Sequence, residues 1–201
     1  MGFSDSNRVV FFFDYDNTLF PTSVVVSNEL AERDRPDLEK RFIDTINLAK
    51  KFGLVYIITN SEDGWVKLSA KNHLPGILSV LNETPIISAR SNYEELSDDP
   101  IMWKYHAMDS VLKNILCCPM FGPKGWENHV VSIGDSTHER DALFKIGKKY
   151  TDITTKSVKF VQDPTVVQLI KQLDIFSNSI RFISNHNGRL DLMMNINVVD
   201  E

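Results

Sequence analysis

The most regular feature of the chain is a series of short, largely apolar runs separated by longer segments in which apolar and polar residues mix. A short run of this kind is typical of a strand that is buried on both faces of a sheet. Each run is therefore expected to form one strand. The runs lie at residues 9–13, 54–58, 85–89 and 130–133.

The segments between these runs have helical spacing. Leu38, Phe42, Ile46 and Ala49 place apolar side chains on one face of a helix, and Gly53 is suited to the C-terminal cap. Further helices are expected at residues 61–81, with a break near Pro75, at 99–116, and after Ser136.

Strands that alternate with helices indicate a parallel sheet with helices on both faces, so the predicted fold class is α/β and Rossmann-like. Beyond residue 150 we expect a strand at 157–161, a small helix capped by Asp163 and Pro164, and a β-hairpin turning at Asn187–Gly188. Nothing in the sequence marks a second domain. We therefore expect one domain over 1–201, with a catalytic core at about 8–150 and a C-terminal extension at about 151–201.

Polar residues follow three of the predicted strands at the point where each ends. Asp14 and Asp16 follow the first run, Thr59 the second and Asp135 the fourth. In extended backbone, residues two apart point to the same side, so the first two carboxylates project together. They repel one another unless a cation lies between them or one holds a proton. The carboxyl ends of parallel strands share one edge, where ligands bind, so we expect a site there.

Lys104 is expected to point toward this site. Ile101, Lys104, Met108, Val111 and Ile115 recur at helical spacing, which places the lysine on the inward stripe near the start of its helix. A lysine facing the core needs an anionic partner. Two other lysines fit this position less well, because Lys113 points the opposite way and Lys124 lies in the loop leading to the wrong edge of the sheet.

Composition narrows the class of protein. The 201 residues are 42% hydrophobic, which is enough for one core. The net charge of -5 disfavours binding to nucleic acid or to an anionic membrane. The only cysteines, Cys117 and Cys118, are adjacent, which suits neither a disulfide framework nor a zinc site. We therefore expect a reducing, cytoplasmic setting. The opening residues fit a loose myristoylation pattern at Gly2, which bulky Phe3 and the lack of a basic cluster disfavour.

The segment from Asp14 to Thr18 closely resembles the first motif, DxDxT, of the haloacid dehalogenase (HAD) superfamily of aspartate-nucleophile phosphotransferases. Thr59 resembles the second motif, Lys104 the third, and Gly134-Asp135 the fourth, all in the order that the superfamily requires. The resemblance covers roughly residues 8–145. Little chain is left at the places where the family inserts a lid, so it implies a member without a large cap domain and with an open site.

The resemblance implies a role for each matching residue. Asp14 is the nucleophile and Asp16 the general acid and base, with Thr59 and Lys104 as the other catalytic residues. Mg²⁺ is the implied cofactor, with Asp14, the backbone carbonyl of Asp16 and Asp135 as ligands. The second acid of the fourth motif is either Glu139, which we prefer in an outer-sphere role, or Asp141.

Thr18, Asn60 and Arg90 are expected to bind the phosphate or the rest of the substrate. The simpler interpretation of Arg90 is a surface arginine in a loop. Trp65 and Tyr93 either rim the pocket or pack in the core.

The sequence thus predicts a Mg²⁺-dependent phosphatase that acts through an aspartyl phosphate on a phosphorylated partner, either a small molecule or a phosphoprotein. The alternatives are a phosphotransferase or mutase of the same superfamily, and a binding module that keeps the fold without turnover. The substrate and the oligomeric state stay open.

Overall fold

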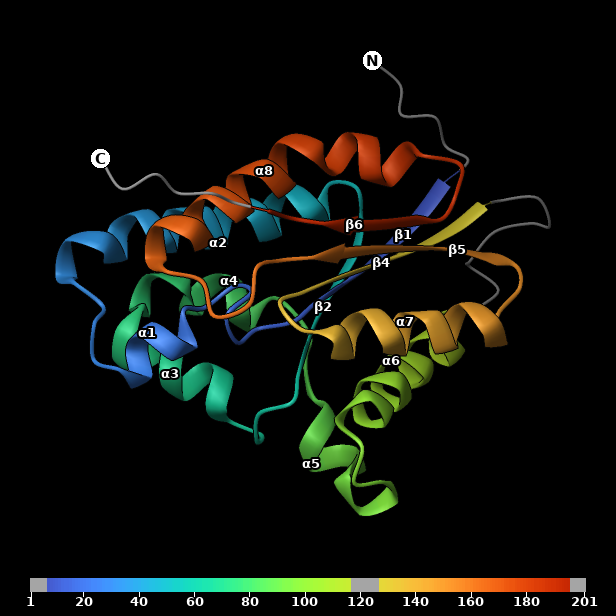
Figure 1. Cartoon of the computed structure of the whole chain (residues 1–201), viewed down its shortest axis with the longest axis horizontal. Coiled ribbons are helices and arrows are strands. Elements are labelled where there is room, and N and C mark those ends of the chain that lie inside the picture. The colour runs from blue at the N-terminus through green and yellow to red at the C-terminus, as the bar shows by residue number, and fades with distance from the viewer. Residues whose placement is uncertain (1–6, 117–126, 196–201) are drawn as a thin grey trace.

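The fold is a parallel sheet covered by helices on both faces (Figure 1). In the computed structural model the described residues are 7–116 and 127–195, so Gly2, Cys117, Cys118 and Lys124 lie outside them. The strands are β1 (Asn7–Phe13), β2 (Gly53–Thr59), β3 (Ile86–Ser88), β4 (Glu127–Gly134), β5 (Ile153–Lys159) and β6 (Leu190–Met193).

Helices fill the connections between the strands. The α-helices are α1 (Thr22–Val26), α2 (Arg35–Lys50), α3 (Trp65–His73), α4 (Leu78–Asn82), α5 (Ala89–Tyr93), α6 (Pro100–Leu116), α7 (Thr137–Lys149) and α8 (Val166–Asn185). Three short 3₁₀ helices join them: η1 (Glu32–Asp34), η2 (Pro75–Ile77) and η3 (Glu94–Leu96). In the described residues, no helix combines the length and the apolar character needed to cross a bilayer.

The strand order is β3-β2-β1-β4-β5-β6, and each neighbouring pair is parallel. The chain starts in the middle of the sheet, builds outward to β3, then returns to add β4 on the other side of β1. The strand order therefore reverses between β1 and β4, and such a switch point is where open α/β sheets bind their ligands. The predicted α/β class, with a Rossmann-like parallel sheet, is confirmed.

The β1 strand explains why both faces of the sheet are covered. Phe11 and Phe13 point to one face, where they pack with α2 and α8, while Val10 and Phe12 point to the other face, toward α6 and α7. Figure 1 shows these two pairs of helices on opposite sides of the sheet. The segments between β1 and α6 are helices and strands of this same body, and no separate cap domain is present in the described part of the chain.

The C-terminal prediction needs correction, because no hairpin forms at Asn187–Gly188. The β6 strand pairs parallel to β5, with Leu190 beside Lys156. Instead of a small helix, α8 has 20 residues and carries the chain back to the amino ends of the strands. A helical crossover of this kind is what a parallel pair requires. The described part of the extension, up to residue 195, thus continues the same sheet.

The helix start was also misplaced. Thr165, rather than Asp163 with Pro164, caps α8, and it forms a capping box with Gln168.

Candidate active site

The loop that follows β1 is held in one tight conformation. The Asp14 amide donates to the carbonyl of Ile133 at 2.8 Å, which ties the loop to β4. Asn17 adopts a left-handed backbone, with φ 55°, that asparagine tolerates better than most residues. Its side chain accepts from the Ser23 amide and donates to Asp163, both at 2.9 Å. The two aspartates are therefore presented from a fixed turn.

Asp14 lies against the predicted lysine. Lys104 is 1% exposed, and its Nζ donates to Asp14 Oδ1 and to the carbonyl of Ile58, and pairs with Glu139 Oε1 at 3.0 Å. Thr18 donates to the other oxygen of Asp14 at 3.3 Å. The inward register inferred for Lys104 is confirmed, and Lys113 is indeed on the outer side, 60% exposed.

Burial and charge act against each other in this cluster. Burial raises the pKa of Asp14 well above its usual value, because Lys104 only partly offsets the loss of water. Burial alone would lower the pKa of Lys104, but the charges of Asp14 and Glu139 raise it above its ordinary value. The lysine is therefore a permanent cation, while Asp14 is a carboxylate that lacks full compensation.

Glu139 belongs to this cluster, and Asp141 does not. Glu139 is buried, and its Oε2 accepts from Ser136 at 2.7 Å. Burial raises its pKa, but the charge of Lys104 together with the hydrogen bonds to the carboxylate outweighs burial and lowers it. Asp141 instead lies near Arg140 at 3.6 Å, half exposed. A Cβ at Gly134 would clash with the Glu139 side chain, so only glycine at this position lets the glutamate approach the end of β4.

Asp16 is held by hydrogen bonds from four side chains. Thr22 and the indole Nε1 of Trp65 donate to Oδ1 at 2.6 and 2.8 Å, while Ser61 and Thr59 donate to Oδ2 at 2.8 and 2.9 Å. An indole can only donate, whereas a hydroxyl can also accept. Oδ1 therefore stays an acceptor toward Trp65, and only the three hydroxyls can turn when the carboxyl gains a proton.

Asp135 directly follows β4, across the switch point from Asp14. It is 8% exposed, and burial together with the charge of Glu139 raises its pKa to about 7. Asp14 and Glu139 thus share the charge of Lys104 with Asp135 nearby, and Lys159 donates to the main-chain oxygen of Asp135 at 3.1 Å. A buried site with more carboxylates than cations favours a divalent metal ion.

The implied Mg²⁺ ligands fit this chemistry, since Asp14, Asp135 and the main-chain oxygen of Asp16 are all hard oxygen donors. No group of three or more His, Cys, Asp or Glu side chains within residues 7–116 and 127–195 is arranged to hold a metal ion. The implied set differs from such a group, because only two of its ligands are side chains.

Two of the predicted substrate residues lie outside the Lys104 cluster. Arg90 is 43% exposed and pairs with Glu94 at 2.8 Å and Glu62 at 3.9 Å. Asn60 donates to the carbonyl of Pro100 at 3.4 Å, and its Oδ1 is buried without a hydrogen-bond partner in the described chain. Tyr93 is partly buried and packs against the core, beside His106.

The sequence missed two contributors to the site, Thr22 and Ser61, and it left Trp65 undecided between core and pocket. All three contact Asp16. Ser61 follows Thr59 at spacing two at the end of a predicted strand, which was a usable signal. Nothing local marks Thr22 or Trp65, because their contacts with Asp16 depend on how α1 and α3 pack.

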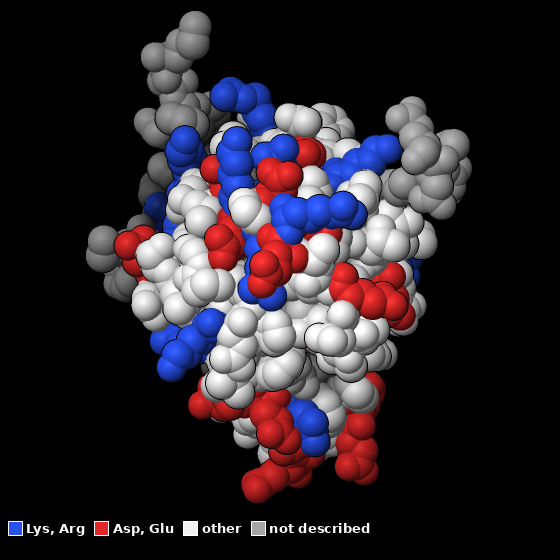
Figure 2. All heavy atoms as spheres, turned by 90° about the vertical axis from the view of Figure 1, so that its left-hand side faces the viewer, with Lys and Arg blue, Asp and Glu red and all other residues white. Residues whose placement is uncertain are grey.

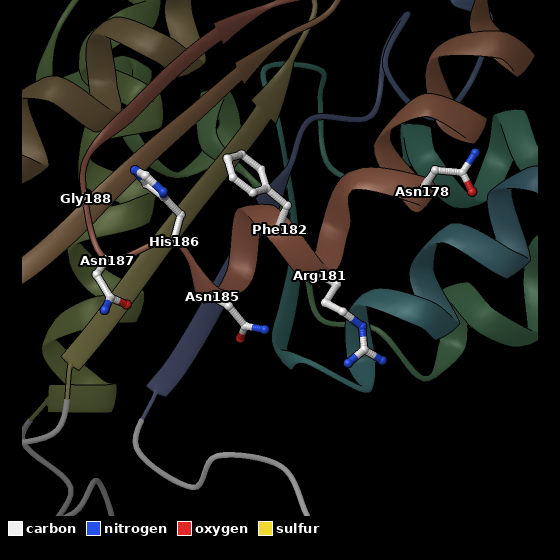
Figure 3. Close-up of a pocket in the computed structure, with 7 residues that line it drawn as sticks. All are labelled: Asn178, Arg181, Phe182, Asn185, His186, Asn187 and Gly188. Carbon is white, nitrogen blue, oxygen red and sulfur yellow. The ribbon is translucent and has the colours of Figure 1, made fainter. Parts of the chain in front are cut away.

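A further hollow among the described residues lies elsewhere. Its volume is about 820 Å³, and it is lined by the last turns of α8 and the segment that follows them, from Asn178 to Gly188 (Figure 3). This end of α8 lies at the amino ends of the strands, and the hollow has no carboxylate in its wall. It is therefore separate from the aspartate cluster.

No protein-family model matches the chain, and no curated protein matches it either. The class that the structure itself defines is a Rossmann-like α/β protein with a buried carboxylate–lysine cluster at its switch point.

Proposed function

We propose that the protein is a Mg²⁺-dependent phosphatase that works through an aspartyl phosphate on Asp14. The observation that carries this proposal is the contact of buried Lys104 with both Asp14 and Glu139, beside Asp16 and Asp135 at the switch point of the sheet. A protein without catalytic work has no physical reason to bury this excess of carboxylates, since each costs desolvation.

The residues divide the reaction into two displacements. Asp14 attacks phosphorus in line, the bond from phosphorus to the leaving oxygen breaks, and Asp16 donates the proton that this oxygen needs. Asp16 then takes a proton from water, which attacks the phosphorus of the acyl phosphate and frees Asp14. Lys104 remains charged and offsets part of the negative charge of Asp14. Mg²⁺, when bound, would supply the positive charge that lets a phosphate approach Asp14.

Thr59 is the last residue of β2 and Asn60 follows it, so both are proposed as donors to the phosphoryl oxygens at this edge of the sheet. The hydroxyl of Thr59 donates to Asp16 in this structure and accepts from the Ser61 amide at 2.9 Å. It can turn toward a phosphoryl oxygen once Asp16 is protonated. Backbone amides at the ends of strands supply fixed donors of the same kind.

The proposal includes a phosphorylated small molecule or phosphoprotein as substrate and a cytoplasmic location. A phosphotransferase or mutase would use the same residues and differ only in the acceptor of the phosphoryl group, and a non-catalytic module would turn over nothing.

Two variants at the aspartates test the mechanism. Asp14→Asn removes the nucleophile, so turnover of an aryl phosphate should vanish and no adduct should form. Asp16→Asn keeps the nucleophile but cannot activate water, so the acyl phosphate should persist. Rapid quenching and intact-mass measurement should find one added phosphoryl group, about 80 Da, on the Asp16→Asn protein alone.

If the phosphoryl adduct formed on the Asp14→Asn protein instead, the roles of Asp14 and Asp16 would be reversed. If neither variant carried the adduct, water would attack the phosphorus directly. Activity should also stop with EDTA and return with Mg²⁺, because Asp14 and a phosphate otherwise repel each other. Full activity in metal-free buffer would contradict the proposal. If no phosphorylated compound in a broad panel is hydrolysed, the result would support the alternative that the protein is a non-catalytic binding module.

A further inference from the structure

A cavity of about 490 Å³ lies beside the side chains that donate hydrogen bonds to the Asp16 carboxylate. Its wall comes from the loop after β2 and from α1, α3 and α5. It includes three residues that contact or flank the Asp16 carboxylate, Thr22, Ser61 and Trp65, together with Asn60, Leu68 and Arg90. A group bound in this cavity would therefore lie beside the residue that is proposed to protonate the leaving oxygen.

Trp65 contacts both the cavity and Asp16, the proposed general acid. It lines the cavity, while its indole N–H holds Asp16 Oδ1 at 2.8 Å. Leu68, one turn further along α3, adds an apolar surface that is 56% exposed. An indole next to an aliphatic side chain offers a flat or apolar group a contact surface, and an aromatic face also attracts cations.

Negative charge predominates among the charged residues of the cavity wall. Glu62 and Asp63 are exposed, and the one cation, Arg90, is already paired with Glu94 and lies 3.9 Å from Glu62. Figure 2 shows acidic side chains gathered at the lower end of this side of the molecule, where α5 and η3 lie in Figure 1, while Lys and Arg gather toward the upper end. An anionic group entering this cavity would meet net negative charge.

We propose that this cavity is the leaving-group subsite of the phosphatase, with Trp65 as the wall shared with Asp16, and that it takes a neutral or cationic leaving group with a flat apolar part. This inference rests on the proposed function. The cavity and its contact with Asp16 define the site, and the wall charges define the class of substrate. Substrates whose leaving group carries further phosphates or carboxylates are disfavoured.

Matched aryl phosphates test the charge preference. The phosphates of 4-(aminomethyl)phenol and 4-(carboxymethyl)phenol have the same ring and differ in the charge carried by the substituent. A second arm uses phosphotyrosine peptides flanked by lysines or by glutamates, which distinguishes a small-molecule source from a protein source. In each pair kcat/KM should be higher for the cationic member, and the ratio should fall as salt is raised, because exposed charges are screened.

Charge reversal at the wall is the decisive variant. In the Glu62→Lys/Asp63→Lys double variant, the ratio of kcat/KM for the cationic substrate to kcat/KM for the anionic substrate should fall by about tenfold. This size is expected for a few exposed charges. Asp44→Lys/Asp152→Lys is the matched control, because both residues are exposed, Asp44 lies within α2 and Asp152 directly precedes β5, and neither lines the cavity. An equal effect of the control, or no preference in the original protein, would overturn the proposal.

Variants of Trp65 separate its two contacts. Trp65→Phe keeps a ring but loses the N–H, so kcat should fall with little change in KM. Trp65→Ala loses both, so KM for the aryl phosphates should also rise, but KM for acetyl phosphate, whose leaving group has no ring, should stay near that of Trp65→Phe. A merely structural tryptophan would raise KM for both kinds of substrate alike, which would contradict the subsite.

The outcomes separate the two proposals. If acetyl phosphate and aryl phosphates are hydrolysed through Asp14 but show neither a charge preference nor a Trp65 effect on KM, the subsite is wrong and the phosphatase stands. If no phosphate is hydrolysed, the phosphatase proposal fails first.

Discussion

Lys104 keeps its charge where an isolated ammonium group would be costly, because two buried carboxylates share it. The pairing makes each partner dependent on the others: Asp14 and Glu139 lose their nearest cation if the lysine is removed. From the sequence alone, removing a charge from an inward stripe is expected to relieve a desolvation cost. With two partner carboxylates in place, removal instead leaves uncompensated buried charge.

Lys104→Met should therefore abolish turnover and also destabilise the fold. We expect a loss of about 3–5 kcal/mol in the free energy of unfolding, measured by urea denaturation in EDTA, as for other buried pairs that lose one partner. Lys113→Met is the control, because Lys113 is 60% exposed and its loss should cost about 1 kcal/mol or less. Equal stability of the two variants would mean that Asp14 and Glu139 are not both ionised.

Residue-scale prediction from the sequence worked where one helix or strand decides the direction of a side chain. The register of α6 alone pointed Lys104 inward, and the end of β1 alone placed Asp14 and Asp16. It did not work for Trp65 and Thr22, whose contacts with Asp16 depend on how separate helices pack around the loop. It also left Glu139 open, because an acid in the first turn of a helix is favoured even when it faces solvent.

The α6 and α7 helices are joined by a second charged group, on the face away from the active site. Asp109 of α6 is buried and accepts from Lys149 and Tyr150 at the end of α7, at 2.6 and 2.8 Å, and pairs with Lys113 at 2.9 Å. Burial alone would raise the pKa of Asp109, but these donors outweigh burial and lower it. The ionised form therefore holds the two helices together.

This network should make part of the stability depend on pH. A carboxyl group whose pKa is lower in the folded state stabilises the protein above its unfolded pKa of about 4, and the contribution disappears as the pH falls through the folded value. Asp109→Asn should lower stability near neutral pH by about 1–3 kcal/mol. The difference from the original protein should shrink toward about pH 2.

Thermal unfolding followed across this pH range measures the effect. Asp152→Asn is the control, because this residue is exposed and, among the described residues, its side chain accepts only from its neighbour Thr151. A gap between Asp109→Asn and the original protein that stays constant with pH would show that Asp109 acts through shape rather than charge.

Prediction of elements from the sequence was strongest for the buried strands and weakest at the C-terminus. The Asn187–Gly188 pair is a local turn signal, but whether the strand after it runs parallel or antiparallel depends on where the chain comes from. The capping box of Thr165 and Gln168 starts a helix long enough to cross the sheet, and that length decides the direction of β6. The short Leu190–Met193 strand has no apolar run that would have revealed it.

Across the whole molecule, the sheet should be most stable at its centre. Strands β1 and β4 have neighbours on both sides and are covered on both faces, whereas β3 and β6 form the two edges with three and four residues each. Amide hydrogen exchange should therefore be slowest in β1 and β4 and fastest in β3 and β6. If β1 exchanged as fast as β6, the active-site edge would not be the rigid part of the fold.

The position of β1 in the middle of the sheet has a consequence during synthesis on the ribosome. The strand is made first, and β2 follows soon after, but its other neighbour is β4, whose His129 pairs with Val9. Closing a contact between such distant positions is slow, because the intervening chain loses much of its freedom. Until β4 has emerged, Asp14 has neither the Ile133 carbonyl nor Asp135 beside it. Nascent chains that end before β4 should therefore lack the site, however well β1 and β2 have already paired.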